Sequence, residues 1–118
     1  MLNYSFDGEK LMLKTYSEVY FINLGRALFF QADDHYSYVF YSDKEKYMLP
    51  FGLSTIEDAL TSLENNNRFV RMGRKYIVNV GKVFKVNVFK QQLFMEGKEN
   101  NIVLNIPKPV LSQFLEQL

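Results

Sequence analysis

Residues 26–41, RALFFQADDHYSYVFY, hold two apolar segments separated by an acidic break. The first segment, residues 26–32, is a near-continuous apolar run of strand length, and such a run is typical of a strand buried on both faces. Asp33 and Asp34 end it, since adjacent acidic residues usually mark a turn. Residues 36–41 then resume with alternating aromatic side chains, the period of a half-buried strand. We therefore predict two consecutive strands of a β-meander.

The other apolar segments are also short, rich in Val, Ile, Phe and Tyr, and bounded by turn residues, so a period of two fits them better than a helical period. Tyr16 and Ser17 separate two of these segments and predict a hairpin. The polar residues 42–45 predict a turn that continues the meander. We predict a mostly β fold, with further strands at residues 11–15, 18–22, 46–49, 76–79, 83–88, 92–95 and 102–106.

Two segments have helical patterns. Residues 54–57, Ser-Thr-Ile-Glu, match the capping box, in which a hydroxyl caps the helix and a glutamate reaches back to it. This predicts a helix at residues 54–64, ended by the three asparagines at 65–67. Pro107 and Pro109 flank Lys108, and proline suits the first turn of a helix. The apolar face of this last helix is predicted to hold Val110, Leu111, Phe114, Leu115 and Leu118.

The composition excludes several classes of protein. A chain of 118 residues with 47% hydrophobic residues is long enough to fold, and we expect residues 1–118 to form a single domain. It has no apolar run that could span a bilayer and no signal-peptide pattern, so we expect a cytoplasmic protein without membrane contact. With no cysteine, one histidine and only isolated glycines, we expect no enzyme activity, no metal site, no cofactor and no small-molecule substrate.

The charge of the chain is unevenly distributed. Residues 1–67 carry five basic and ten acidic side chains, a net charge of −5. Residues 68–118 carry nine basic and three acidic side chains, a net charge of +6. From Arg68 to Lys90 there are seven cations and no anion. This basic strip is able to attract phosphates, although a solvated basic surface is an equally good interpretation of charge alone.

Residues 69–79, FVRMGRKYIVN, resemble the signature of the LytTR family, DNA-binding domains found mostly at the C-terminus of bacterial response regulators. In that signature an arginine follows a phenylalanine by two positions, and a His-Arg-Ser-type triplet precedes Ile-Val-Asn. Residues 27–32 are similar to the family's Ile-Xaa-Tyr-Ile-Glu-Ala strand, and residues 53–63 lie where its capped helix falls. The resemblance covers about residues 10–118, and we expect no receiver domain in the chain.

The resemblance implies a fold and a function. The fold is an elongated arrangement of small, mostly antiparallel β-sheets with one or two short helices. The function is sequence-specific binding to double-stranded DNA by a bacterial transcription regulator, the output domain of a two-component system, with loops that contact the major groove. Two copies occupy direct-repeat sites in this family and bend the DNA, so a homodimer on DNA is expected.

The family's DNA contacts carry over to particular residues. The arginine of the triplet matches Arg74, whose guanidinium can bind guanine or phosphate. The loop after the Glu-Ala strand matches residues 34–37, with His35 and Tyr36 as the candidates. The basic residue that opens the last helix matches Lys108, close to backbone N–H groups that favour phosphate. Lys75 stands where the family usually has a small hydroxyl side chain, and it adds a second cation beside Arg74.

Arg71 has two interpretations, and Asn79 has one. Arg71 is either a phosphate contact or an ion-pair partner of the acidic half, and we include it among the DNA-contacting candidates. Asn79 is predicted to be structural, bonding backbone groups at the end of a strand.

The tyrosines at 36, 38 and 41 can form a base-stacking row, but closely spaced tyrosines on a strand more often pack half-buried.

A different class of function is also open. The chain can be a small β-rich interaction or sensor module, whose basic strip binds an acidic partner protein or its own acidic half. Single-stranded RNA binding on tyrosines is a third possibility, although the aromatic motifs of the known RNA modules are missing.

Overall fold

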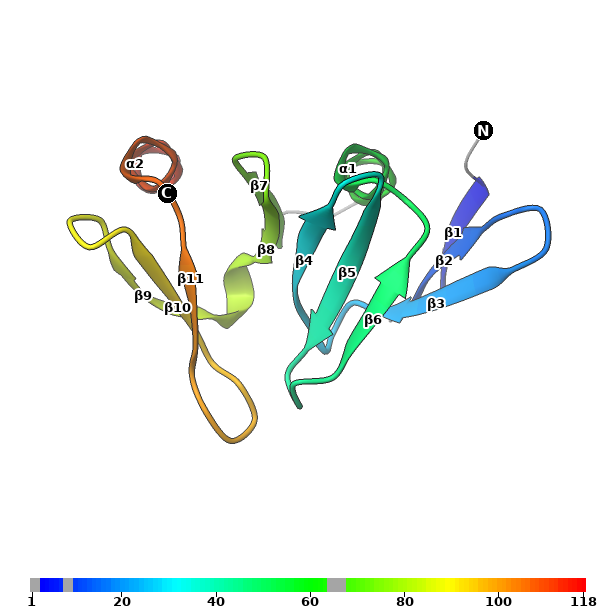
Figure 1. The fold of residues 1–118 in the computed structure, drawn as a ribbon, viewed down its shortest axis with the longest axis horizontal. Coiled ribbons are helices and arrows are strands. Elements are labelled where there is room, and N and C mark those ends of the chain that lie inside the picture. Colours follow the sequence, from blue (N-terminus) through cyan, green and yellow to red (C-terminus); the bar gives the residue numbers. More distant parts are fainter. Residues whose placement is uncertain (1–2, 8–9, 64–67) are drawn as a thin grey trace.

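The computed structural model describes residues 3–7, 10–63 and 68–118, with backbone alone for 3–7. These residues form two three-stranded sheets and one five-stranded sheet, with every strand pairing antiparallel, and two α-helices. The domain is elongated, with extents of 45 × 29 × 28 Å. Figure 1 shows the sheets arranged side by side along the long axis. A mostly β fold built from small antiparallel sheets is therefore confirmed.

The N-terminal sheet consists of β1 (Asn3–Asp7), β2 (Lys10–Lys14) and β3 (Val19–Asn23) in that order. The predicted hairpin is β2 and β3, joined by a loop in which the Thr15 N–H donates to Glu18 O at 2.9 Å. The loop is two residues longer than the predicted gap, because Thr15 and Glu18 are taken into the turn. Strand β1 was not predicted, since its alternation of polar and apolar residues extends over only five residues.

The central sheet has the order β6-β5-β4-β8-β7. Its middle strand is β4 (Ala27–Asp33), which pairs with β5 (Tyr36–Tyr41) on one side and β8 (Tyr76–Asn79) on the other. The outer strands are β6 (Lys46–Leu49) and β7 (Phe69–Met72). The central position of β4 explains its apolar run, because both of its faces are covered. Strand β7 was not predicted, since four residues that include an arginine give little periodicity.

The C-terminal sheet consists of β9 (Val83–Asn87), β10 (Gln92–Met95) and β11 (Ile102–Asn105), with β10 in the middle. A single 3-10 turn, η1 (Val80–Lys82), connects it to the central sheet. These strands match their predicted positions to within one residue. The helices are α1 (Leu53–Thr61) and α2 (Lys108–Glu116).

Two hydrophobic cores lie on opposite faces of the central sheet. The first contains Phe30 and lies between the N-terminal sheet, the central sheet and α1. The second contains Phe29 and lies between the central sheet, the C-terminal sheet and α2. Adjacent residues of a strand point to opposite faces, so Phe29 and Phe30 enter different cores. The run that begins at Ala27 is therefore buried on both sides, as predicted.

The predicted capping box of the first helix is wrong. Helix α1 begins at Leu53 with Gly52 in the N-cap position, and no side chain caps it. Ser54 is already within the first turn, so its hydroxyl is too far along to serve as the cap. Glu57 forms an ion pair with Arg71 instead of reaching back to the helix start. The helix ends at Thr61, three residues earlier than predicted, and the predicted stop at residues 65–67 lies outside the described residues.

Helix α2 begins at Lys108, directly after Pro107 as the N-cap, which agrees with the prediction. Leu111 and Phe114 are buried in the second core. The prediction is wrong at the C-terminal end, because Leu118 is exposed and Leu115 is exposed in part. The last turn extends past the core that the first two turns cover. No helix among the described residues is long and apolar enough to cross a bilayer.

Candidate nucleic-acid interface

Three segments that are far apart in the sequence meet at one edge of the central sheet. They are the β4–β5 turn, the beginning of α1 and the β7–β8 turn, and all three lie along the upper edge in Figure 1. Between them is a shallow open hollow of about 390 Å³, lined by Ala32, Asp34, His35, Gly52, Leu53, Ser54, Thr55, Arg71 and Arg74. Three of the predicted site residues, His35, Arg71 and Arg74, are thus brought together by the fold.

The β4–β5 turn presents His35 to solvent. Asp34 has a φ of 55°, the left-handed region that aspartate tolerates better than most residues. This conformation reverses the chain within two residues and leaves the His35 side chain 89% exposed. His35 Nε2 lies 3.8 Å from Asp34 Oδ1. Tyr36 opens β5 and is about half exposed, whereas the neighbouring Ser37 is buried.

The other tyrosines of β5 are packing residues. Tyr41 is buried in the first core, with its hydroxyl accepting from the Asn23 N–H at 3.2 Å. Tyr38 is half-buried beside Phe40, with their ring centroids 6.5 Å apart. The favoured interpretation of this row, packing in place of base stacking, is confirmed for these two side chains. Tyr36 alone is exposed enough to contact another molecule.

The β7–β8 turn presents Arg74 and Lys75. Gly73 has a φ of 73°, which glycine adopts without strain and residues with a Cβ rarely adopt. Here the chain departs from the histidine that the family signature commonly has. Arg74 and Lys75 are both exposed. Within the described part of the chain, the Arg74 guanidinium has no hydrogen-bond or ion-pair partner, so it is available to an external ligand.

Arg71 holds this turn in place. Its Nε donates to Gly73 O at 2.8 Å, and its Nη2 donates more weakly to Arg74 O at 3.4 Å. Its Nη1 donates to Glu57 Oε1 on α1 at 3.1 Å. The side chain of Arg71 is only 23% exposed. The ion pair with the acidic half, one of the two interpretations of Arg71, is therefore present, and the guanidinium connects α1 to the turn that carries Arg74.

Two further contacts fix the turn against the middle of the sheet. The Ala32 N–H donates to Lys75 O at 2.8 Å, which joins the end of β4 to the start of β8. At the other end of β8, Asn79 Nδ2 donates to Ala27 O at 2.8 Å, and Asn79 Oδ1 accepts from the Gly81 N–H at 3.1 Å. Asn79 is buried, so its predicted structural role is confirmed, with one bond local and one to a neighbouring strand.

Lys108 lies in a separate group, at the start of α2. Its side chain is exposed, and its backbone N–H donates to Gln91 Oε1 at 3.3 Å. Helix α2 is close to the β7–β8 turn, since a Cβ at Gly73 would lie 3.6 Å from Val110 Cγ2. The sequence prediction missed the roles of Glu57 and Gln91, because their partners are 14 and 17 residues away and no local pattern signals such pairs.

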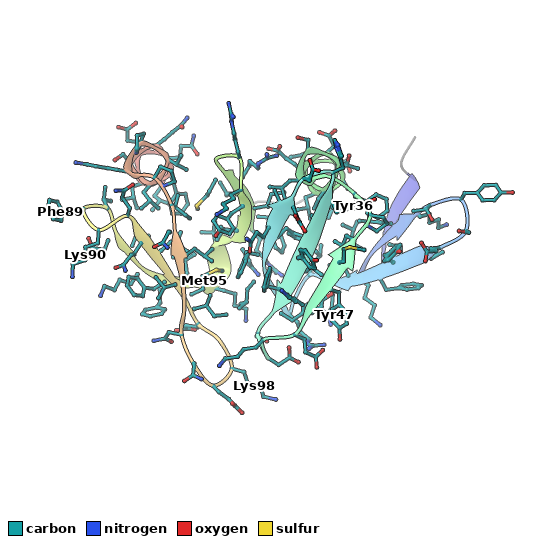
Figure 2. The ribbon with its side chains drawn as sticks, in the orientation of Figure 1. Tyr36, Tyr47, Phe89, Lys90, Met95 and Lys98 are labelled. Carbon is teal, nitrogen blue, oxygen red and sulfur yellow. The ribbon has the colours of Figure 1, made fainter. Side chains whose placement is uncertain are left out.

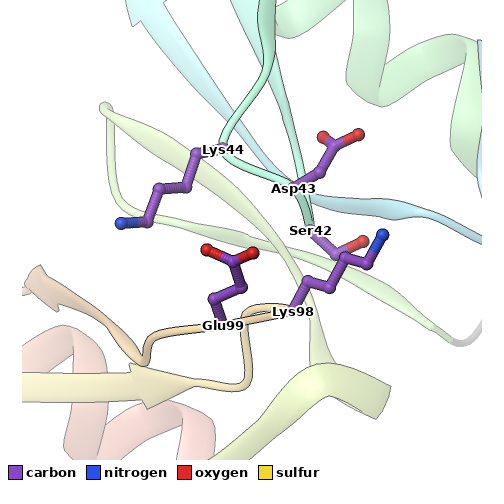
Figure 3. Close-up of a pocket in the computed structure, with 5 residues that line it drawn as sticks. All are labelled: Ser42, Asp43, Lys44, Lys98 and Glu99. Carbon is purple, nitrogen blue, oxygen red and sulfur yellow. The ribbon is translucent and has the colours of Figure 1, made fainter.

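A contact at the opposite edge ties the central sheet to the C-terminal sheet. The Lys98 N–H in the β10–β11 loop donates to Ser42 O in the β5–β6 turn at 2.7 Å. Figure 3 shows the two loops meeting, with side chains of both signs around a small cavity of about 120 Å³. Together with the second core, this contact keeps the two groups of exposed cations in a defined relative position.

The geometry is that of a known fold. The family model of the LytTr DNA-binding domain matches residues 17–117. The chain belongs to the LytTr DNA-binding domain family. A solved LytTr DNA-binding domain from Bacillus cereus superposes on this one with a TM-score of 0.63 at 16% sequence identity, and the match covers 93% of this chain and 96% of that chain. No curated protein matches this chain.

Membership of the LytTr family gives this domain its general function and its fold. It is a DNA-binding domain with the fold of a response-regulator output domain. The resemblance found in residues 69–79 is confirmed, because the family model includes that segment and the B. cereus domain shares the fold. At 16% identity the solved structure supports the fold alone, so the individual DNA contacts have to be argued from the residues of this chain.

Proposed function

We propose that this LytTr domain binds double-stranded DNA sequence-specifically and regulates transcription, with its turns in the major groove. The observation that carries the proposal is the exposed guanidinium of Arg74. It stands on a turn braced by Arg71 and faces the same hollow as His35. Specific recognition requires donors held rigidly at groove depth, and a braced turn supplies this without a recognition helix.

Arg74 is the best candidate for reading a base. A guanidinium can donate two parallel hydrogen bonds to guanine O6 and N7, which is the commonest specific contact in the major groove. Lys75 follows it directly and is exposed, but an ammonium is a point charge without a fork. We therefore assign a base contact to Arg74 and a phosphate contact to Lys75.

His35 and Tyr36 form the second contact. The imidazole can donate to a base or a phosphate, and the half-exposed Tyr36 can donate through its hydroxyl. Asp34 lies beside His35 and repels phosphate, so a base edge is the better ligand for this turn. We therefore assign His35 a base contact close to that of Arg74, because both residues line the same hollow.

Lys108 is the third contact and binds phosphate. The length of the domain, 45 Å, exceeds one turn of B-DNA, which is about 34–36 Å. Contact groups spread along this axis can therefore reach successive grooves on one side of the duplex. The family's use of direct repeats implies two copies per site, which bind in the same orientation and assemble as a homodimer only on DNA.

The alternative, an acidic protein partner, uses the same cations. Of the basic residues in the described part of the second half, Arg71 alone forms an ion pair with the acidic half. The other described cations of this half form no ion pair, and apart from Lys85, whose ammonium lies over the Phe94 ring, they can bind DNA or an acidic surface. A duplex and an acidic protein differ in charge density, so salt dependence and sequence enrichment separate the two functions.

The test is to incubate the protein with a library of random duplexes at two salt concentrations and to sequence the retained DNA. A motif in direct repeat that survives the higher salt supports the proposal. Binding without enrichment, lost as salt rises, contradicts it and favours the interaction module.

Arg74→Ala then tests the base contact on the selected duplex. We expect a loss of about 5- to 150-fold in affinity, the value of one good bidentate pair, and relaxed preference at one position. The melting temperature should stay within about 2 °C of wild type, because exposed side chains contribute little to stability. Unchanged DNA affinity would contradict the assignment.

A further inference from the structure

The tip of the β9–β10 hairpin presents an aromatic side chain and a cation that the proposed contacts do not include. Phe89 is 86% exposed at this tip, and Lys90 follows it. Figure 2 shows Phe89 pointing away from the body of the domain, at the end where α2 and the C-terminal sheet lie. Within the described residues its ring has no aromatic or cationic neighbour. Single exposed apolar side chains are common on protein surfaces, so the case for a contact at Phe89 rests on the turn and the cation beside it.

The turn that carries Phe89 is rigid. Asn87 Oδ1 accepts from the Lys90 N–H at 3.0 Å, and Val88 O accepts from the Gln91 N–H at 3.1 Å. Gln91 has a φ of 57°, the left-handed conformation that completes the reversal. Because the backbone of the tip is bonded on both sides of Phe89, ordering this side chain on a ligand costs less entropy than ordering a loose loop.

The tip is also coupled to Lys108. Gln91 O accepts from the Ile106 N–H at 3.1 Å, and Gln91 Oε1 accepts from the Lys108 N–H at 3.3 Å. Gln91 thereby caps α2, whose N-cap residue is a proline without a side-chain acceptor. A hollow of about 320 Å³ lies between the tip and the helix start, lined by Lys90, Gln91, Asn105, Ile106 and Pro107. Lys90 therefore lines this hollow, and Lys108 directly follows Pro107, which lines it from the side of the helix.

We infer that the β9–β10 tip is a DNA contact of this domain, with Lys90 on a backbone phosphate and Phe89 packed against the adjacent sugar or base edge. This inference rests on the proposed function. The charge favours DNA over an acidic protein surface only in combination with the ring, since an exposed aromatic side chain beside a cation suits the apolar C–H groups of deoxyribose and the methyl group of thymine, which lie next to the phosphates. The contact extends the footprint beyond Lys108, at the C-terminal end of the domain.

The experiment measures the affinity of wild type, Phe89→Ala and Lys90→Gln for the selected duplex at about 50 mM and about 200 mM salt. If Lys90 neutralises one phosphate, Lys90→Gln should lower the salt slope by about 0.9, so that affinity falls about 3.5-fold less across this range. Phe89→Ala should weaken binding about fivefold with the slope unchanged, because the ring buries apolar surface and carries no charge. Both side chains are exposed, so neither change should alter the melting temperature.

Lys85→Gln is the matched control. Lys85 lies in the same hairpin, but its ammonium sits 4.6 Å from the ring centroid of Phe94, on the face of the sheet away from the second core. This variant removes the same charge from the same hairpin and should bind with the wild-type slope. A duplex trimmed at the end that the tip contacts should make wild type, Phe89→Ala and Lys90→Gln bind equally.

The outcomes separate the two claims. If Arg74→Ala weakens specific binding about 5- to 150-fold while Phe89→Ala and Lys90→Gln bind like wild type, the inference about the tip is overturned and the proposed function stands. An equal loss of slope in Lys85→Gln and Lys90→Gln also overturns it, since the effect is then one of net charge. If the wild-type protein retains no duplex, the proposed function fails and the inference fails with it.

Discussion

Replacing Arg71 with lysine tests whether this residue shapes the turn that contacts DNA or touches DNA itself. Arg71 uses three nitrogens: one on Gly73 O at 2.8 Å, one on Glu57 Oε1 at 3.1 Å and one on Arg74 O at 3.4 Å. Lysine keeps the charge but has one nitrogen, so it cannot serve the helix and the turn at the same time. The variant therefore separates the charge of Arg71 from its geometry.

The magnitude follows from these contacts. A hydrogen bond contributes about 0.5–1.5 kcal/mol net, and the long bond to Arg74 O contributes least. The Arg71 and Glu57 side chains are 23% and 39% exposed, so their ion pair adds at most about 1 kcal/mol. We expect Arg71→Lys to lower the free energy of unfolding by about 1–2 kcal/mol, which corresponds to about 4–10 °C in melting temperature for a domain of this size.

Glu57→Gln makes the test decisive, because the two interpretations predict opposite signs for it. Removing a carboxylate near DNA strengthens binding if only charge matters. If Arg71 braces the turn, the loss of its partner loosens Arg74 and weakens binding. We expect both Arg71→Lys and Glu57→Gln to bind the selected duplex less tightly than wild type in a fluorescence anisotropy titration.

The bracing role is refuted if Arg71→Lys melts like wild type and Glu57→Gln binds at least as tightly as wild type. In that case Arg71 is a phosphate contact. A lysine can replace an arginine at a phosphate, but its single ammonium cannot reach the three separate acceptors that the guanidinium binds. Arg71→Ala would then lower the salt slope by about 0.9 without destabilising the fold.

Two further predictions concern stability. Asn79→Ala leaves Ala27 O and the Gly81 N–H without their buried partner, so denaturant unfolding should show a loss of about 2–4 kcal/mol, and a loss below about 1 kcal/mol would contradict the structural role. Burial raises the pKa of Tyr41 and of Tyr76 above the ordinary value of 10.0. Both hydroxyls hold their proton more tightly in the folded state, so the stability they contribute is present below about pH 10 and is lost as pH rises through their folded pKa. Ultraviolet titration of tyrosinate should show a component that ionises above the ordinary pKa and that is lost when the protein is denatured; a single titration at the ordinary pKa would show the prediction to be wrong.

The sequence alone was sufficient for most of the strands and for the family. Strands β4, β5 and β8 and the start of α2 lie where the local pattern places them, because alternation, turn residues and proline act over a few neighbouring residues. The signature at residues 69–79 likewise depends on spacing within one turn and one strand, and the family model confirms it.

The sequence did not determine which residues cooperate at the site. Residues 54–57 have the local pattern of a capping box, yet the carboxylate of Glu57 pairs with Arg71 on β7. The helix begins at Leu53, one residue before Ser54, so the box is out of register and Glu57 is left to pair with the guanidinium that the fold brings to the helix. The same holds for Gln91, whose side chain caps a helix that begins 17 residues later.

The positions of the contacts in space depend on the tertiary structure for the same reason. The chain itself supplies Arg74 on a glycine turn, His35 after an acidic pair, and a basic strip, all readable in linear order. Only the antiparallel pairing of β4 with β8 brings the turns of His35 and Arg74 to one edge, and only the second core sets α2 beside them. Side-chain patterns reach over a few residues, whereas strand pairing and burial join segments across the whole chain.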